Sequence, residues 1–565
     1  MTEFSVWAPN RSRVRVHNGP SVHEMAVGED GWWRVEVPDA APDYAFQLDD
    51  EPDELPDPRS RWQPDGVHQR SRLYDHAEFR WTDAAWTGRQ LPGGIVYELH
   101  IGTFTPEGTF DSAIGKLDHL VELGVDFVEV MPVNAFDGPH GWGYDGVLWY
   151  AAHDPYGGPD GFKRFVDACH NRGLAVLLDV VYNHLGPSGA YLDRFGPYFA
   201  GETIWGPTLN MDGPQSDGVR RYVFDNALSW LRDFHVDGLR LDAVHALSDR
   251  RAIQVLEELS SEVDALSVHL RRPLSLIAES DLNDPKLVTP REAGGYGLQA
   301  QWNDDLHHCL HATLSGERQG YYADFGSLQA LAATLTGVFF HAGTWSSFRG
   351  RHHGRRVNTL TTPGHRFLGY LQNHDQIGNR ATGDRLSDTV SPGLLACGAA
   401  IVLCSPYTPM IFMGEEWAAS TPWQFFASFP DPKLADAVRT GRRKEFAEHG
   451  WAEQDVPDPV DPATFERSKL RWAEAETAGH AEMLGTYRAL IALRRARPEL
   501  ADPRLPQLSV DVDEDNRVLV LHRGDLRVVC NLGGHQIKVT GTVLFSSAEP
   551  GAPESVTVVE VSAGG

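Results

Sequence analysis

Eight short apolar runs alternate with helix-length amphipathic segments between residues 91 and 505, and this alternation limits the possible folds more than any other feature of the chain. Each run has the length of a buried strand, and the helix-like segments between them include 110–123, 159–172 and 217–234. The eight runs are 95–101, 127–132, 175–182, 238–244, 274–278, 298–302, 367–371 and 409–413. Eight β–α alternations predict an α/β fold, a parallel (β/α)8 TIM barrel with its active site at the carboxyl ends of the strands.

Shorter strand-like runs, separated by Gly, Pro, Asn and Asp, lie on both sides of the predicted barrel. Residues 1–88 predict an N-terminal β-sandwich that resembles a glucan-binding module, and residues 506–565 predict a small C-terminal β-domain. The barrel would then occupy 89–505, with a Gly-, Pro- and aromatic-rich excursion at 185–216 and further loops at 281–296 and 340–366. With 41% hydrophobic residues, the 565-residue chain can bury a full core.

The composition excludes several kinds of partner. Asp and Glu number 78 against 50 Lys and Arg, for a net charge of −28, so we expect neither nucleic acid nor an anionic membrane as a partner. The uncharged segment 393–414 has about the length of a membrane span, but its prolines and glycines predict a buried helix followed by a buried strand. Five scattered cysteines and no basic, apolar leader favour a reducing cytoplasm.

Charged residues and histidines lie at the carboxyl ends of four of the predicted strands and are the candidate catalytic and binding residues. They are His184, Arg240, Asp242, Glu279, His374 and Asp375. In a barrel these ends converge, and crowding of Asp242, Glu279 and Asp375 would leave one protonated acid beside an ionised one, as cleavage of a glycosidic bond requires. Arg240 precedes Asp242 by two residues, so both face the same side and Arg240 should hold Asp242 as a nucleophile requires. For any single residue, a strand-end cap or a barrel salt bridge is the alternative interpretation.

These four segments resemble the four signature regions of the α-amylase superfamily of glycoside hydrolases and transglycosidases, and the resemblance covers nearly the whole chain. It implies that Asp242 is the nucleophile, that Glu279 is the acid/base, and that Asp375 is a third carboxylate that holds sugar hydroxyls. The residues that would flank the sugar at the cleavage site or stack on it are Tyr144, His184, Arg240 and His374.

Within this superfamily, residues 96–104 (VYELHIGTF) resemble the group of glycogen-branching enzymes and trehalohydrolases. The seventh strand is followed by NHDQIGNR at 373–380, where branching enzymes usually carry Ser-His-Asp-Glu, and the segments 242–246, 301–308 and 441–446 also resemble the trehalohydrolases. The resemblance implies hydrolysis, with retention, of the α-1,4 bond next to the terminal trehalose of maltooligosyltrehalose, an α-1,4-glucan substrate. A branching transglycosylase or an α-1,6 debrancher is the alternative. A barrel without catalysis is disfavoured because all three carboxylates are present.

A leaving trehalose would need side chains that bind its hydroxyls on the far side of the acid. The candidates at predicted strand ends are His245, Asp304, Asp305, His307, Gln376 and Asn379. Asp304 and Asp305 could instead cap the next helix, and Gln376 and Asn379 could brace loops. His307 and His311 have the spacing of metal ligands but no third ligand follows, so we expect no metal and no other cofactor, and solvent-exposed positions for the remaining histidines of this run.

Aromatic side chains in loop-like contexts could stack on the apolar faces of sugar rings. They are Trp142, Tyr144, Trp149, Trp205, Trp345 and Trp423, with loop or core packing as the alternative for about half of them. We expect Trp7, Trp32 and Trp33 to pack the N-terminal unit against the barrel rather than to bind starch.

Overall fold

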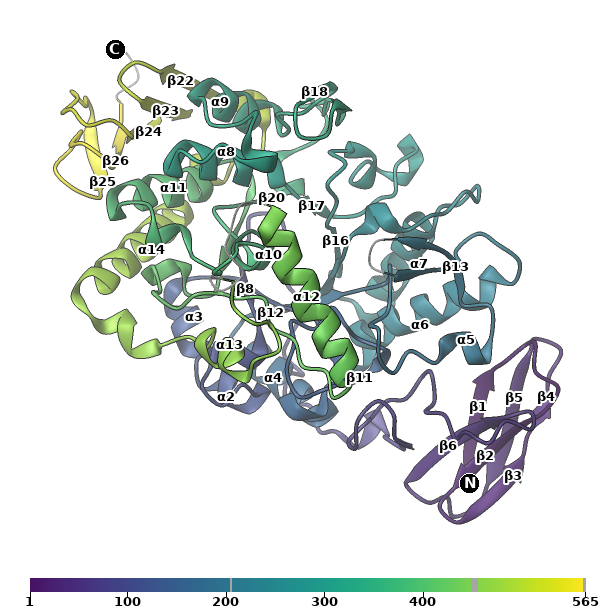
Figure 1. The fold of residues 1–565 in the computed structure, drawn as a ribbon. Helices are drawn as coiled ribbons and strands as arrows, with labels where there is room; N and C mark the ends of the chain where they lie inside the picture. Colours follow the sequence, from purple (N-terminus) through teal and green to yellow (C-terminus); the bar gives the residue numbers. More distant parts are fainter. Residues whose placement is uncertain (204–205, 449–455, 562–565) are drawn as a thin grey trace.

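Eight parallel strands close a barrel in the computed structural model, which describes residues 1–203, 206–448 and 456–561 (Figure 1). Around the barrel the order is β12-β15-β16-β17-β20-β21-β8-β9. The strands span β8 Val96–Leu99, β9 Phe127–Val130, β12 Ala175–Val180, β15 Gly238–Leu241, β16 Ser275–Ala278, β17 Ala300–Trp302, β20 Phe367–Tyr370 and β21 Thr408–Phe412. Each overlaps one of the eight predicted runs, so the predicted TIM barrel is confirmed.

The barrel interior changes from apolar to polar along the strands. Leu177, Ile277 and Leu368 belong to a buried cluster inside the barrel. Because side chains alternate along a strand, the inward-facing residue two positions later is Asp179 on β12 and Tyr370 on β20, and it is Glu279 just after β16. The apolar layer thus forms the floor of the site, and the polar residues gather at the carboxyl ends of the strands.

Helices surround the barrel. They include α4 Gly158–His170, α6 Ser216–Asp233, α7 Val255–Leu270, α8 Asp304–Ser315, α9 Leu328–Gly337, α11 Pro392–Cys404 and α14 Ala478–Ala496. The single helix predicted at 110–123 is wrong, because the chain forms α2 Phe110–Ile114 and α3 Leu117–Leu123, separated at Gly115 and Lys116. The uncharged segment 393–414 forms the buried helix α11 and the strand β21, as predicted, and no helix of the described ranges is long and apolar enough to cross a membrane.

The N-terminal region forms two antiparallel sheets (Figure 1). One has the order β1-β5-β4 and the other β3-β2-β6-β7; the strands are β1 Thr2–Trp7, β2 Val14–Asn18, β3 Ser21–Glu24, β4 Ala26–Val27, β5 Trp32–Val37, β6 Asp43–Leu48 and β7 Ser71–Arg72. Trp7 packs against Tyr198 with 5.3 Å between the ring centroids, and it leaves no room for a Cβ at Gly218 of α6. Trp7 therefore joins these sheets to the barrel.

The C-terminal region forms one antiparallel sheet with the order β22-β23-β24-β26-β25. Its strands are β22 Leu508–Asp513, β23 Val518–Arg523, β24 Leu526–Asn531, β25 Thr542–Ser546 and β26 Ser555–Glu560, and α11 packs against β24 and β26. All five cysteines are buried and unpaired.

Two segments expected as loops contain regular structure. The excursion 185–216 holds α5 Leu192–Phe195 and the hairpin of β13 Phe199–Thr203 with β14 Gly206–Leu209. The segment 340–366 holds the hairpin of β18 Thr344–Ser346 with β19 Arg351–His353. The short helix α10 His374–Gly378 follows β20, and the long helix α12 Pro432–Glu448 comes after β21. Figure 1 shows α12 crossing in front of the barrel next to α10.

Candidate active site

A fully buried arginine holds the centre of the site. Nη1 of Arg240 lies 2.8 Å from Oδ2 of Asp179 and 2.7 Å from Oδ1 of Asp242, and Nη2 lies 3.7 Å from Oε2 of Glu279. This grouping follows from the strand register, because Asp179 of β12 pairs directly with Arg240 of β15. Burial opposes the charge of Arg240, but Asp179, Tyr144 and the two other acids outweigh burial and raise its pKa. A permanent positive charge thus lies among the carboxylates.

Both carboxylate oxygens of Asp242 have donors. Arg240 donates to Oδ1, and the Nδ2 amide of Asn183 donates to Oδ2 at 2.8 Å and to the backbone carbonyl of Asp242 at 3.1 Å. The Asp242 side chain is 14% exposed, so it is held in place without being sealed from solvent. These two donors hold the carboxylate in the fixed orientation that a nucleophile requires.

The carboxyl group of Glu279 has a raised pKa. Its side chain is 15% exposed, and burial, reinforced by the negative charges of Asp242, Asp304 and Asp375, raises the pKa of Glu279 to about 8 despite the opposing effect of Arg240. The N–H of Ala243 donates to Oε2 of Glu279, and Ala243 has a left-handed backbone with φ 41° and ψ 49°. This turn directly after Asp242 points the amide at the acid.

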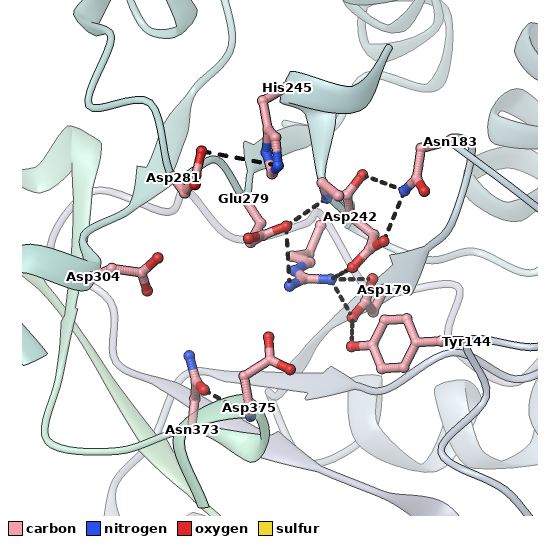
Figure 2. A network of polar contacts seen from close by, with 12 residues as sticks. Tyr144, Asp179, Asn183, Asp242, His245, Glu279, Asp281, Asp304, Asn373 and Asp375 are labelled. Carbon is pink, nitrogen blue, oxygen red and sulfur yellow. Dashed lines mark hydrogen bonds and ion pairs between the residues drawn. The ribbon is translucent and has the colours of Figure 1, made fainter. Parts of the chain in front are cut away.

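Asp375 enters the site from the first turn of α10. Asn373 caps this helix, because its side-chain oxygen accepts from the N–H of Asp375 at 2.9 Å. The Asp375 side chain is 41% exposed, and Figure 2 shows it pointing toward Glu279 and Asp242. The third carboxylate therefore faces the other two.

His374, Tyr144 and His184 form one wall of the site. Burial opposes the charge of His374, but Asp375 and Glu98 outweigh burial and raise its pKa to about 9. The Tyr144 hydroxyl lies 2.9 Å from Nε2 of His374 and also donates to Asp179, and the two rings stack 5.3 Å apart. Nε2 of His184 lies 3.1 Å from the Tyr144 carbonyl. These contacts fix the Tyr144 ring within the site.

Four of the predicted acceptor-side residues gather around Glu279 and Asp375. His245 lies 3.9 Å from Asp281, which follows Glu279 by two residues. The Tyr370 hydroxyl donates a hydrogen bond to Oδ1 of Asp304, and Nε2 of Gln376 lies 3.4 Å from the same oxygen. Burial, with smaller effects from nearby acids, raises the pKa of Asp304 to about 6. Nδ2 of Asn379 lies 3.5 Å from Asp375.

Asp305 and His307 point away from this space. Asp305 accepts from the Nδ2 amide of Asn283 at 3.0 Å and from the N–H of His341 at 2.8 Å. His307 is buried, with Nδ1 2.7 Å from the Leu371 carbonyl and Nε2 3.0 Å from the Tyr322 hydroxyl. Both side chains bind protein groups that brace α8, so the structure does not bring them to the site.

Two other expectations for this run change. Asn303, not Asp304 or Asp305, caps α8, because its side-chain oxygen accepts from the N–H of Leu306. His311 is buried and lies 2.8 Å from Glu317, so its expected solvent-exposed position is wrong. Within the described ranges, no three His, Cys, Asp or Glu side chains have an arrangement that could hold a metal ion.

The predicted aromatic residues divide between core and surface. Trp149 and Trp423 are core residues, and Trp142 is buried between Trp423 and His374. Trp345 is 56% exposed on the β18–β19 hairpin, and Trp205 lies outside the described residues.

Three residues that shape the site were not among the predicted ones. Asp179 joins Arg240 to Tyr144, Asn183 orients Asp242, and Glu98 binds Nδ1 of His374. A charged residue inside an otherwise apolar strand was the available signal for Asp179 and Glu98. The partner of each depends on strand register, which the sequence does not reveal.

Comparison with known proteins places the chain among glucan-cleaving enzymes. The family model "Alpha amylase, catalytic domain" matches residues 71–197. A malto-oligosyltrehalose trehalohydrolase of Mycobacterium tuberculosis is 57% identical over 97% of this chain and 96% of its own length, and that of Saccharolobus solfataricus is 43% identical over 96% and 93%. The crystal structure of a putative α-amylase from Salmonella typhimurium is 38% identical with a TM-score of 0.91, covering 99% of this chain and 97% of that one. The chain therefore belongs to the malto-oligosyltrehalose trehalohydrolase family of the α-amylase superfamily.

Proposed function

We propose that this protein hydrolyses the α-1,4-glucosidic bond next to the terminal trehalose of maltooligosyltrehalose, releasing trehalose and a shortened maltooligosaccharide. The observation that carries the proposal is the pairing of a fixed carboxylate, Asp242, with a neighbouring acid, Glu279, whose pKa is about 8. Membership of the trehalohydrolase family assigns the bond that this pair cleaves.

In the first step, the sugar on the non-reducing side of the bond lies between Tyr144, His374 and Asp242. Glu279 donates its proton to the glycosidic oxygen, and the trehalose leaves as an alcohol. Asp242 attacks the anomeric carbon and forms a covalent glycosyl-enzyme. Arg240 remains charged throughout and stabilises the carboxylates on either side of the reacting carbon.

In the second step, Glu279, now ionised, takes a proton from a water molecule that attacks the same anomeric carbon from the side that trehalose has left. The bond to Asp242 breaks, the glucan is released with its configuration retained, and Glu279 is protonated again for the next cycle. Asp375, on the opposite side of the site, is placed to hold sugar hydroxyls and to favour the positively charged, flattened ring of the transition state.

The leaving trehalose would be bound by polar side chains on the far side of Glu279 from Asp242. His245, Asp304, Gln376 and Asn379 carry the hydrogen-bonding groups that the hydroxyl-rich disaccharide needs, and Asp304 joins Gln376 to Tyr370 in one network. A plain maltooligosaccharide presents a different second sugar to these groups. The difference between the two substrates should therefore appear mainly on this side of the cleft.

A product analysis tests the proposal. Purified protein is incubated with maltotriosyltrehalose and, in separate reactions, with maltopentaose and with amylose. Free trehalose and maltotriose from the first substrate, with much slower cleavage of the second, are the expected result. New α-1,6 branches on amylose, or equal cleavage of both oligosaccharides, would contradict it and would favour a branching or general glucan-cleaving activity.

A further inference from the structure

Helix α12 carries a largely buried arginine, Arg442, that contacts the helix of the third carboxylate. The Arg442 side chain is 9% exposed, although most of α12 is exposed or half-buried. Its guanidinium lies over the rings of Phe446, at 4.5 Å, and Phe425, at 5.1 Å. Phe446 is one helical turn beyond Arg442, so the two side chains share a face of α12.

The polar contacts of Arg442 are with the carboxyl end of α10. Nη2 donates to the carbonyl oxygen of Gly378 at 2.7 Å and to that of Arg380 at 3.5 Å. Its carboxylate contact is Glu445, 3.3 Å away and 53% exposed. A cation that binds the last carbonyls of a helix satisfies acceptors that have no partner within the helix and interacts favourably with its dipole.

Helix α10 is thereby held at both ends. Asn373 caps its start, and Arg442 binds its last residue, Gly378. Its packing face is fixed too, because a Cβ on Gly378 would lie 2.1 Å from the Trp142 ring. Phe425 packs on Trp142 at 5.2 Å, and Trp142 packs on His374 at 5.7 Å. The ring that stacks on Arg442 therefore also supports the start of α10.

We propose that Arg442 is a positioning residue for the reaction, because it fastens α10 to α12 and so sets the position of Asp375 and His374. The inference rests on the proposed function, since it concerns the placement of two residues assigned to the sugar at the cleavage site. It gives the segment 441–446 a physical role.

Kinetics of Arg442→Ala test the proposal. Removing the guanidinium frees the end of α10, and a displacement of about 1 Å in a positioned group can cost about 100-fold in rate. We expect kcat for trehalose release to fall by roughly 10- to 100-fold, with a smaller change in KM, because Asp375 acts most strongly on the transition state. Arg442→Lys should recover part of the loss, since an ammonium group can still donate to one carbonyl.

Arg439→Ala is the matched control. Arg439 also lies on α12, but its ion pairs are with Asp458 at 2.6 Å and Asp436 at 3.1 Å. We expect kcat of this variant to stay within about threefold of the wild type. Two further measurements separate a loss of positioning from a loss of folding. One is the affinity of the Glu279→Gln variant for intact substrate, with and without Arg442→Ala, and the other is the thermal midpoint of each variant.

The outcomes are distinct. A lower kcat in Arg442→Ala, with a nearly unchanged thermal midpoint and substrate affinity, supports the positioning role. An unchanged kcat, an equal loss in Arg439→Ala, or a loss that tracks the folded fraction overturns it. A wild-type enzyme that releases no trehalose would instead overturn the proposed function, independently of these variants.

Discussion

Replacing Arg240 by methionine should impair both stability and catalysis, and it should do so in a pH-dependent way. The side chain is fully buried and pairs with Asp179 and Asp242. Removing one partner of a buried ion pair typically costs about 3–5 kcal/mol, because the remaining charge stays buried. At about 2.1 cal/mol/K per residue, a 565-residue chain that unfolds as one unit has an unfolding entropy of about 1.2 kcal/mol/K. The thermal midpoint should therefore fall by about 3–4 °C at pH 8.

The pH dependence follows from Asp179. Burial already raises the pKa of Asp179 to about 6, and Arg240 acts against that rise. Without Arg240 the pKa must rise further, so the folded protein retains a proton that the unfolded chain releases. A group whose pKa is raised by folding stabilises the folded state at low pH and loses that contribution as the pH rises through the raised pKa. The deficit of Arg240→Met should thus shrink between pH 8 and pH 5.

Calorimetry at both pH values and steady-state kinetics measure these effects. Arg272→Met is the matched control. The Arg272 side chain is 9% exposed and pairs with the buried Asp237, which precedes β15 at the opposite end of the barrel. Both variants should lose stability, but only Arg240→Met should lose kcat, by about 100-fold or more. An equal stability deficit at pH 5 and pH 8, or an equal loss of activity in the control, would contradict this role of Arg240.

Three further predictions concern single groups. Glu279→Gln should lower turnover by several orders of magnitude while substrate still binds; activity of this variant within about tenfold of wild type would show that the acid is misassigned. The kcat/KM of the wild type should fall as the pH rises above about 8, where Glu279 loses its proton. Asp304→Ala should slow cleavage of maltooligosyltrehalose more than that of plain maltooligosaccharide. It should also move the alkaline fall of kcat/KM to lower pH, because Asp304 helps to raise the pKa of Glu279. An equal loss on both substrates, with an unchanged pH profile, would indicate a structural role. Asp83→Asn should lower the thermal midpoint most between about pH 4 and 6.5, because the lowered pKa of Asp83 keeps it ionised there and the raised pKa of His170 keeps its partner charged. This loss of stability should shrink as the pH rises through the pKa of His170. A loss independent of pH would argue against the Asp83–His170 ion pair.

The barrel could be predicted from the sequence because its strands are buried on both faces and appear as apolar runs of strand length. The positions of Arg240, Asp242 and Glu279 could be predicted for the same reason, since each lies on or directly after such a strand. Predicting that these residues lie together therefore required only the knowledge that the carboxyl ends of barrel strands converge.

The acceptor side was harder to predict because it is built on a helix. Helix α8 begins at Asp304, and each residue turns the side-chain direction by about 100°. Asp304 contacts Tyr370 and Gln376, whereas the next residue, Asp305, is turned toward Asn283 and His341. His307 lies nearly one turn further along the helix and is buried against Leu371 and Tyr322. Sequence adjacency alone could not separate these residues.

Contacts between distant segments could not be predicted from the sequence at all. Arg442 and Gly378 are 64 residues apart in the sequence, and Glu98 and His374 are 276 apart. Whether such residues meet depends on the closure of the barrel and on the path of α12.

Trapping the covalent intermediate is the most direct test of the account. A Glu279→Gln variant is incubated with a 5-fluoro-maltosyl fluoride, which carries its own leaving group, and the digested protein is mapped by mass spectrometry. We expect one added 5-fluoro-maltosyl group on the peptide that contains Asp242, with fluoride as the leaving group, and no label after Asp242→Asn. Label on another residue, or turnover to a product of inverted configuration, would contradict the assignment of Asp242 as the nucleophile.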